Sequence, residues 1–252
     1  MKSGIFLSVR EKATRFPGKV LKPLGEKSVT AFLIERLRTS KMADMVVMTT
    51  STDPRDEVLC AIAESCGIET FCGSPEDKLL RYRDAARAHH LDFVVIVDGD
   101  DPFVSIEHID RIISYNADHS ADYTICDDLP LGATGFGLRV QALEKICVDR
   151  PEQDTEVWGQ LFLDDPRFNC AVLPEPEPRY RRPDIRMTLD YPADYEFFTT
   201  VVNAVTEQGR GTDFNSIMDF LSDHPEAVEI NQHAQGQYEE NLQKTIVIQE
   251  QG

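Results

Sequence analysis

The stretch that decides the fold is Asp92-Phe-Val-Val-Ile-Val97-Asp98-Gly99-Asp100-Asp101-Pro102. Its first part holds five apolar residues in succession, as expected of a central parallel strand that is covered on both faces of a sheet. Its second part combines three carboxylates with glycine and proline, which are the residue types of a tight loop. Because open α/β sheets bind ligands at the carboxyl ends of their strands, this loop is a candidate functional site.

Strand and helix patterns alternate on either side of this stretch. Ser28 and Asp53 are expected to cap helices, and Pro54 suits a first helical position. The alternation predicts an α/β fold, with a mostly parallel, doubly wound sheet and helices on both faces. The expected strands cover residues 3–9, 45–50, 68–71, 92–97, 121–126, 136–140, 168–173 and 185–189. The expected helices cover residues 28–41, 54–66, 78–90, 106 onward, 141–147, 151–163, 192–207 and 214–222.

The composition limits the class of protein. The 252 residues carry a formal charge of -18, with a pI of about 4.7. Such a surface repels nucleic acid and anionic membranes, so neither is expected as a partner. We find no run of ~20 apolar residues that could span a membrane and no signal-peptide pattern. The six cysteines form no Cys-x-x-Cys pair. A cytoplasmic protein without structural zinc or disulfides is therefore expected.

A cationic loop follows the first expected strand. It contains Arg10, Arg15 and Lys19, with Pro17-Gly18 to permit a tight turn. Arginine offers a planar fork of donors and lysine a point charge, and both suit phosphate oxygens. The alternative is a solvated basic loop without a ligand.

Aspartates recur at two strand ends. Asp98, Asp100 and Asp101 would raise one another's pKa unless a cation neutralises them, and Mg²⁺ favours one or two carboxylates together with substrate phosphates. Asp190 would share a strand face with Arg186, because side chains alternate along a strand. The alternatives are turn chemistry for the first group and helix capping for Asp190.

Arginines gather before the last expected strand, where an anionic acceptor or an interface could use them. The alternative is a surface cluster of ion pairs with Glu175 and Glu177. The arginines are Arg179, Arg181, Arg182 and Arg186.

The chain has no His-x-x-x-His, Gly-x-Ser-x-Gly or Walker motif, so a zinc enzyme, a hydrolytic triad and a P-loop ATPase are not expected. The cationic loop and the carboxylates instead favour chemistry on a nucleoside triphosphate.

The loop Arg10-x₄-Arg15-Phe-Pro-Gly-Lys19-Val-Leu-x-Pro-Leu-Gly resembles the N-terminal signature of cytidylyltransferases that make CMP-activated acidic sugars. The match is closest to the spore-coat polysaccharide branch, with CMP-KDO and CMP-sialate synthetases as relatives. Three further blocks match in the right order, so that the resemblance covers about residues 3–200. They are Gly73-Ser-Pro-Glu-Asp-Lys-Leu-Leu-Arg-Tyr82, Asp98-Gly-Asp-Asp-Pro102 and Thr188-Leu-Asp-Tyr-Pro-Ala-Asp-Tyr-Glu-Phe-Phe198.

The resemblance implies a three-layer nucleotide-diphospho-sugar transferase fold and transfer of CMP from CTP to a small acidic acceptor, with release of pyrophosphate. It also implies Mg²⁺ as cofactor and a homodimer. The residues it implies are Arg10, Arg15 and Lys19 at the triphosphate, Ser74 near the base and ribose, and Asp100 and Asp190 at the metal. Beside them we expect Asp98 at the nucleotide and, from the arginine cluster, Arg182 and Arg186 at the acceptor. Arg10, Lys19, Asp100 and Asp190 would form the catalytic set.

The chain departs from the family pattern in several places. Asp101 stands where Cys or Glu is frequent, and Glu11-Lys12 where small residues are usual. Gly135-Phe-Gly-Leu and Thr155-Glu156-Val157 replace blocks of the acceptor half. A phosphonate or another non-sugar acid is therefore an alternative acceptor. A uridylyl- or guanylyltransferase and a catalytically silent nucleotide-binding subunit also stay open.

One nucleotidyltransferase domain is expected over residues 1–224, with an acceptor and dimerisation part at about 127–186. The following residues 225–252 are rich in Gln, Asn and Glu. They are expected as a polar tail, either loose throughout or with a short strand over residues 245–248.

Overall fold

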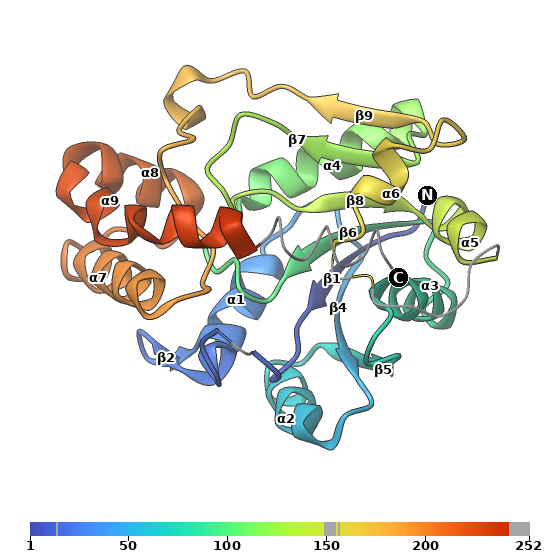
Figure 1. Cartoon of the computed structure of the whole chain (residues 1–252), viewed down its shortest axis with the longest axis horizontal. Coiled ribbons are helices and arrows are strands. Elements are labelled where there is room, and N and C mark those ends of the chain that lie inside the picture. Colours follow the sequence, from blue (N-terminus) through green and yellow to red (C-terminus); the bar gives the residue numbers. More distant parts are fainter. Residues whose placement is uncertain (14, 149–154, 156, 242–252) are drawn as a thin grey trace.

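The computed structural model describes residues 1–13, 15–148, 155 and 157–241. Over this part of the chain a seven-stranded sheet forms the centre, with strand order β5-β4-β1-β6-β8-β7-β9 (Figure 1). The strands are β1 Ser3–Ser8, β4 Met45–Ser51, β5 Glu69–Gly73, β6 Phe93–Asp98, β7 Tyr123–Cys126, β8 Phe136–Arg139 and β9 Cys170–Leu173.

Strand direction divides the sheet into two parts. Strands β5, β4, β1 and β6 are mutually parallel, and Ile5 of β1 lies in register between Val46 and Val95. Strand β8 runs antiparallel to both β6 and β7, and β7 pairs parallel with β9. The prediction of a mostly parallel sheet is therefore confirmed, with β8 as the reversed strand.

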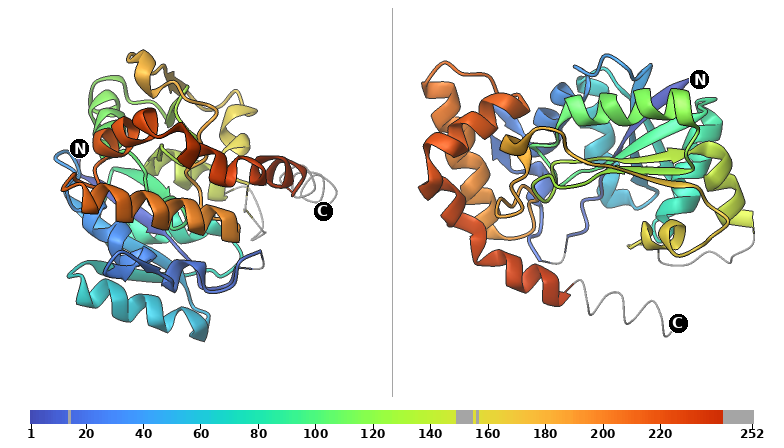
Figure 2. Two further views of the ribbon diagram at one scale, coloured as in Figure 1. Left: turned by 90° about the vertical axis from the view of Figure 1, so that its left-hand side faces the viewer. Right: turned by 90° about the horizontal axis from the view of Figure 1, so that it is seen from above.

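Helices cover both faces of the sheet, because its strands are apolar on both sides. Ile5 and Val95 pack with α1, α2 and α4, whereas Phe6 and Ile96 pack with α3 and α5. Figure 2 shows these layers from two further directions. The helices are α1 Val29–Leu37, α2 Glu57–Ser65, α3 Lys78–Ala88, α4 Ile106–His119, α5 Val140–Val148 and α6 Gln160–Leu163.

A separate group of helices lies at one end of the sheet, at the left of Figure 1. Helices α7 Pro192–Glu207, α8 Phe214–Asp223 and α9 Pro225–Gln232 share a third apolar cluster. Phe103, from the loop after β6, packs against Phe197 and Phe198 of α7 within this cluster. This packing fixes the loop after β6 against the C-terminal helices.

Local signals fix several helix starts. The Ser28 hydroxyl accepts from the Ala31 amide at 3.2 Å, and the Asp53 carboxylate accepts from the Arg55 amide at 3.0 Å. Both predicted caps are therefore confirmed. Asp53 and Pro54 open a short 3₁₀ helix, Pro54–Asp56, that leads into α2.

The segment 185–189, predicted as a strand, is extended, but no continuous strand of the described residues lies beside it. Its amides bond in turn to two different loops, because Met187 donates to the Leu131 carbonyl and Leu189 to the Asp100 carbonyl, each at 2.7 Å. Only an isolated bridge between Leu131 and Arg186 results. The segment thereby connects the loop after β6 with the loop before β8.

Two further expectations differ from the structure. The helix expected over residues 151–163 lies partly outside the described residues; residues 155 and 157–159 are described and are not helical, and α6 covers the last four. Residues 225–241, which the composition left open as a loose tail, are helical in α9 and again over 234–241, with Ala227, Val228 and Ala234 buried. The strand expected over residues 245–248 lies outside the described residues.

None of the helices in the described part of the chain combines the length and apolar character that a membrane span requires.

Candidate functional site

A cavity of about 840 Å³ opens at the carboxyl ends of the central strands β1 and β6. Among the described residues that line it, all the cations come from the N-terminal half of the chain, and the C-terminal half contributes carboxylates and neutral groups. A second cavity, of about 280 Å³, lies at the amino ends of β4 and β5 and is lined by none of the predicted site residues. The cations are Arg10, Lys12, Arg15, Lys19 and Lys78.

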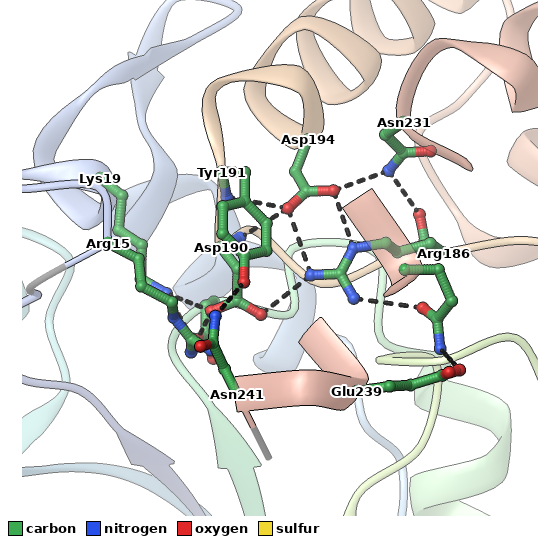
Figure 3. A network of polar contacts seen from close by, with 11 residues as sticks. Arg15, Lys19, Arg186, Asp190, Tyr191, Asp194, Asn231, Glu239 and Asn241 are labelled. Atoms are coloured by element: carbon green, nitrogen blue, oxygen red, sulfur yellow. Dashed lines mark hydrogen bonds and ion pairs between the residues drawn. The ribbon is translucent and has the colours of Figure 1, made fainter. Parts of the chain in front are cut away.

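Lys19 links two aspartates that are far apart in the sequence. Its ammonium lies 2.6 Å from Asp100 Oδ2 and 3.2 Å from Asp190 Oδ1, while Arg15 Nη2 lies 2.6 Å from the same Asp190 oxygen (Figure 3). Two of the three predicted triphosphate cations thus meet both predicted metal aspartates at one point of the cavity.

The charges of this cluster shift one another's pKa. Burial by itself would lower the pKa of Lys19, but Asp100 and Asp190 outweigh burial and raise it. Burial would likewise raise the pKa of Asp100, but Lys19 outweighs it and lowers that pKa. Asp101 differs, because burial and then the neighbouring Asp100 and Asp98 hold its pKa well above the ordinary value. Lys19 and Asp100 therefore form an ion pair at neutral pH.

A close approach of two loops brings Asp100 to Lys19. The Gly99 amide donates to the Ser8 carbonyl at 2.8 Å. A β-carbon at Gly99 would lie 2.6 Å from the side chain of Val9, too close for any other residue. Glycine at this position lets the loop after β6 pack against the end of β1.

Asp190 is held by a buried network on its other side. Arg186 Nη2 lies 2.9 Å from Asp190 Oδ2, and Arg186 Nε lies 2.9 Å from Asp194 Oδ1 (Figure 3). Asp194 also accepts from the amides of Asp190 and Tyr191, at 2.8 and 2.9 Å. The residue that caps α7 is Tyr191, with Asp194 completing the capping box. The capping alternative for Asp190 is therefore wrong.

The nucleotide residues implied by the family resemblance lie nearby in different settings. Arg10 lines the cavity and its guanidinium donates to the Pro75 carbonyl. Asp98 lines it too, 4.0 Å from the ammonium of Lys78. Ser74 belongs to the turn before α3, where its hydroxyl accepts from the Asp77 amide at 3.0 Å, and it is not among the described lining residues.

The two arginines expected at the acceptor do not reach the cavity lining in the described part of the chain. Arg182 pairs with Asp184 at 2.6 Å near the surface, and Arg186 is buried between Asp190 and Asp194. Their role in acceptor binding stays a prediction. The surface alternative describes Arg179 well, since it pairs with Glu177 at 2.9 Å and both side chains are about half exposed.

Sequence reasoning did not single out Lys78, Tyr238 and Asn241, which also line the cavity. Lys78 stands inside one of the matched family blocks. Tyr238 was hidden in the polar segment, although Ala227, Asn231, Ala234 and Tyr238 follow the spacing of one helix face.

The site fits a divalent cation that is shared with a substrate. The carboxylates of Asp100 and Asp190 converge on a single positively charged group, the Lys19 ammonium. Mg²⁺ is held in proteins by one or two carboxylates together with substrate phosphates. Within the described residues no group of three or more His, Cys, Asp and Glu side chains is placed to hold a metal ion. The ion would thus need oxygens from the substrate.

Comparisons with known proteins identify the family of the chain. Residues 5–163 match the family model described as cytidylyltransferase. The spore coat polysaccharide biosynthesis protein SpsF of Bacillus subtilis is 29% identical over 228 residues, covering 88% of this chain and 94% of its own.

Solved structures share the fold. A cytidylyltransferase from Leptospira borgpetersenii has a TM-score of 0.80 at 24% identity, covering 90% of this chain and 97% of its own. CMP:2-keto-3-deoxy-manno-octonic acid synthetase complexed with CTP has a TM-score of 0.62 at 14% identity, with 82% and 100% covered. A Mycobacterium tuberculosis protein solved with manganese has a TM-score of 0.56 at 18% identity, with 79% and 97% covered. On the match over residues 5–163, the chain belongs to the cytidylyltransferase family.

Proposed function

We propose that the protein transfers CMP from CTP to an acidic sugar or a similar small acidic acceptor, with Mg²⁺, and releases pyrophosphate. The observation that supports this most directly is the meeting of Arg15, Lys19, Asp100 and Asp190 at one wall of the cavity. Family membership supports the nucleotidyl transfer, and the similarity to SpsF supports a sugar-like acceptor.

The cluster suggests how the triphosphate would be bound. Lys19 and Arg15 are paired with carboxylates in the structure, and phosphate oxygens can replace those carboxylates as their partners. Asp100 and Asp190 would then hold the metal, whose charge neutralises phosphate oxygens. Binding of the nucleotide and of the metal would thereby depend on each other.

The chemical step is an in-line displacement. The oxygen of an acceptor hydroxyl forms a bond to the α-phosphorus and loses its proton to water, the bond from that phosphorus to the bridging oxygen breaks, and its electron pair leaves on pyrophosphate. Arg10, Arg15 and Lys19 would hold the triphosphate and stabilise the charge that develops on the leaving group. Holding both reactants in one cavity contributes the orientation.

Ser74 and Asp98 are proposed on the nucleotide side, with Asp98 in the cavity wall and Ser74 shaping the turn before α3. The lining residues from the C-terminal half of the chain, which include no cation among those described, remain for the acceptor. A homodimer formed through residues 127–186 and a cytoplasmic location also belong to the proposal.

The test is pyrophosphate release with CTP, UTP, ATP and GTP, each paired with 2-keto-3-deoxy-manno-octonic acid, a phosphonate and other small acids. We expect release with CTP and an acidic sugar in the presence of Mg²⁺, and its loss with a chelator. Preference for UTP or GTP would move the protein to a uridylyl- or guanylyltransferase. Tight CTP binding without release for any pair would favour a silent subunit.

A further inference from the structure

The helical segment 234–241, outside the matched residues 5–163, contributes to the cavity. Figure 1 shows this segment, in red, extending from α9 toward the carboxyl ends of the central strands. Tyr238 and Asn241 line the cavity together with Asp100, Asp101 and Asp190. The segment is therefore part of the site as well as part of the fold.

Arg186 attaches this segment to the carboxylate network. Its Nη1 donates to Gln235 Oε1 at 3.3 Å, and its guanidinium carbon lies 4.7 Å from the centre of the Tyr238 ring. The same guanidinium binds Asp190. At the end of the segment, Asn241 Nδ2 donates to the Tyr191 hydroxyl at 2.9 Å (Figure 3). The contacts of the segment with Arg186 and with Tyr191 therefore hold Tyr238 and Asn241 at the cavity.

The Tyr238 hydroxyl has no hydrogen-bond partner among the described residues, although the side chain is partly buried and lines the cavity. A hydroxyl that lines a cavity can bond to a molecule bound there. Burial raises the pKa of Tyr238 to about 12, with Asp190 and Asp101 acting in the same direction. The hydroxyl therefore keeps its proton and can donate to a ligand at neutral pH.

The distribution of charge decides which ligand this is. The described cations that line the cavity come from residues 10–78 of the sequence, whereas Tyr238 and Asn241 present neutral donors and acceptors. Neutral hydroxyl and amide groups match the hydroxyl groups of a sugar-like molecule better than they match phosphates.

We propose that Tyr238 and Asn241 form an acceptor subsite that binds hydroxyl groups of a polyhydroxylated acceptor and helps to decide which acceptor is used. This inference rests on the proposed function. It adds a contact from the C-terminal helix, with Arg186 as the positioning residue that orients the ring of Tyr238.

The experiment compares steady-state kinetics of Tyr238→Phe and Asn241→Ala with those of the wild type. The acceptor is the polyhydroxylated acid that supports pyrophosphate release, tested beside its single-deoxy analogues. Tyr238→Phe keeps the ring on Arg186, so the thermal unfolding midpoint should not change. We expect KM for the acceptor to rise about 3- to 10-fold, as for one lost hydrogen bond, while KM for CTP stays constant. Gln237→Ala, an exposed change on the same helix, is the control.

The deoxy analogues give a second readout that a purely structural role would not change. One analogue should be a poorer acceptor than its parent for the wild type but equal to its parent for Tyr238→Phe. An unchanged acceptor KM in both variants, or a rise in KM for CTP instead, would overturn the subsite while the proposed function stands. Absence of pyrophosphate release by the wild type with every acceptor would overturn the proposed function itself.

Discussion

Lys19 and Arg186 bind the same carboxylate from its two sides, yet their surroundings differ. Lys19 contacts Asp190 Oδ1 and shares its charge with Asp100 at the cavity wall. Arg186 contacts Asp190 Oδ2 and shares its charge with the buried Asp194 at the start of α7. Each cation thus pairs with two aspartates, but one side of Asp190 faces the cavity and the other faces the core.

The two cations suit these different places. Lysine is a compact charge on a flexible stem that can exchange a carboxylate for a phosphate, whereas the planar guanidinium fixes two carboxylates in one geometry. The side chain of Arg186 is only 2% exposed. Each cation pairs with two carboxylates, so the number of charges does not distinguish them. The difference is that Lys19 lines the cavity and Arg186 does not.

The shared carboxylate gives the largest predicted effect. Replacing Asp190 by Ala should lower the rate of pyrophosphate release by about 10³-fold, because the metal and both cations lose a common partner. Asp223→Ala, which removes a carboxylate paired with Arg210 at the surface, is the control and should stay within about twofold of the wild type. Wild-type rates for Asp190→Ala would show that the metal assignment is wrong.

The role of Arg186 in the core is tested by the free energy of unfolding of a variant. Arg186→Met should lower the free energy of unfolding by about 3–5 kcal/mol, because Asp190 and Asp194 would be left buried without this cation. Urea denaturation measures the change. Arg182→Met, at an ion pair nearer the surface, should cost at most about 1 kcal/mol. Equal costs for the two variants would remove the distinction between a fixed and a surface pair.

The role of Lys19 as a phosphate-binding charge at the cavity is tested by Lys19→Gln. This change should lower kcat/KM for CTP by about 10²-fold, since a phosphate-binding charge is lost. It should reduce the free energy of unfolding less than Arg186→Met does, because Arg15 and Arg186 still pair with Asp190. Lys27→Gln, at an exposed pair with Glu35, provides the matched lysine control. A larger loss of stability than activity would contradict an exchangeable role.

Asp101 gives the smallest and most pH-dependent effect, since it is a buried carboxylate with no paired cation among the described residues. Its pKa is raised by burial, Asp100 and Asp98, so the folded state binds a proton more tightly than the unfolded state. The free energy of unfolding should therefore fall as pH rises from 3.8 toward the raised pKa, and this loss is complete above it.

Asp101→Asn removes that dependence. In Mg²⁺-free buffer, the stability of the variant relative to the wild type should increase between pH 4 and pH 8. Denaturation at a series of pH values measures this difference. A difference that stays constant over the range would show that Asp101 is not a titrating, destabilising group.

Much of the fold could be predicted from the sequence because local signals agreed with the overall pattern. The apolar run before Asp98 specifies a strand buried on both faces, and Ser28 and Asp53 specify helix starts through their own side chains. The cationic loop could be placed at the ligand edge because it follows a parallel strand. The blocks that match the family then predicted that Asp190 lies at the same site as the cationic loop and Asp100.

The remaining features depend on tertiary contacts. Asp190 resembles a cap for α7, but Asp194 takes part in the cap, and this choice depends on a buried arginine. Residues 185–189 have the pattern of a strand but bond alternately to two loops. Tyr238 lies in a segment of polar composition, where only the spacing of a few apolar residues indicated a packed helix.

The reversal of β8 has a consequence for how this protein could acquire new substrates. Because β7 ends and β8 begins at the ligand edge, residues 127–135 leave that edge and return to it without crossing the sheet. Their two ends are anchored by the β7–β8 pairing, so insertions or replacements between them need not move either strand. Leu131 bonds to Ile185 and Met187, so replacements in the loop that keep these bonds leave the segment leading to Asp190 in place. Other changes in the loop can therefore reshape the cavity while the parallel strands stay unchanged.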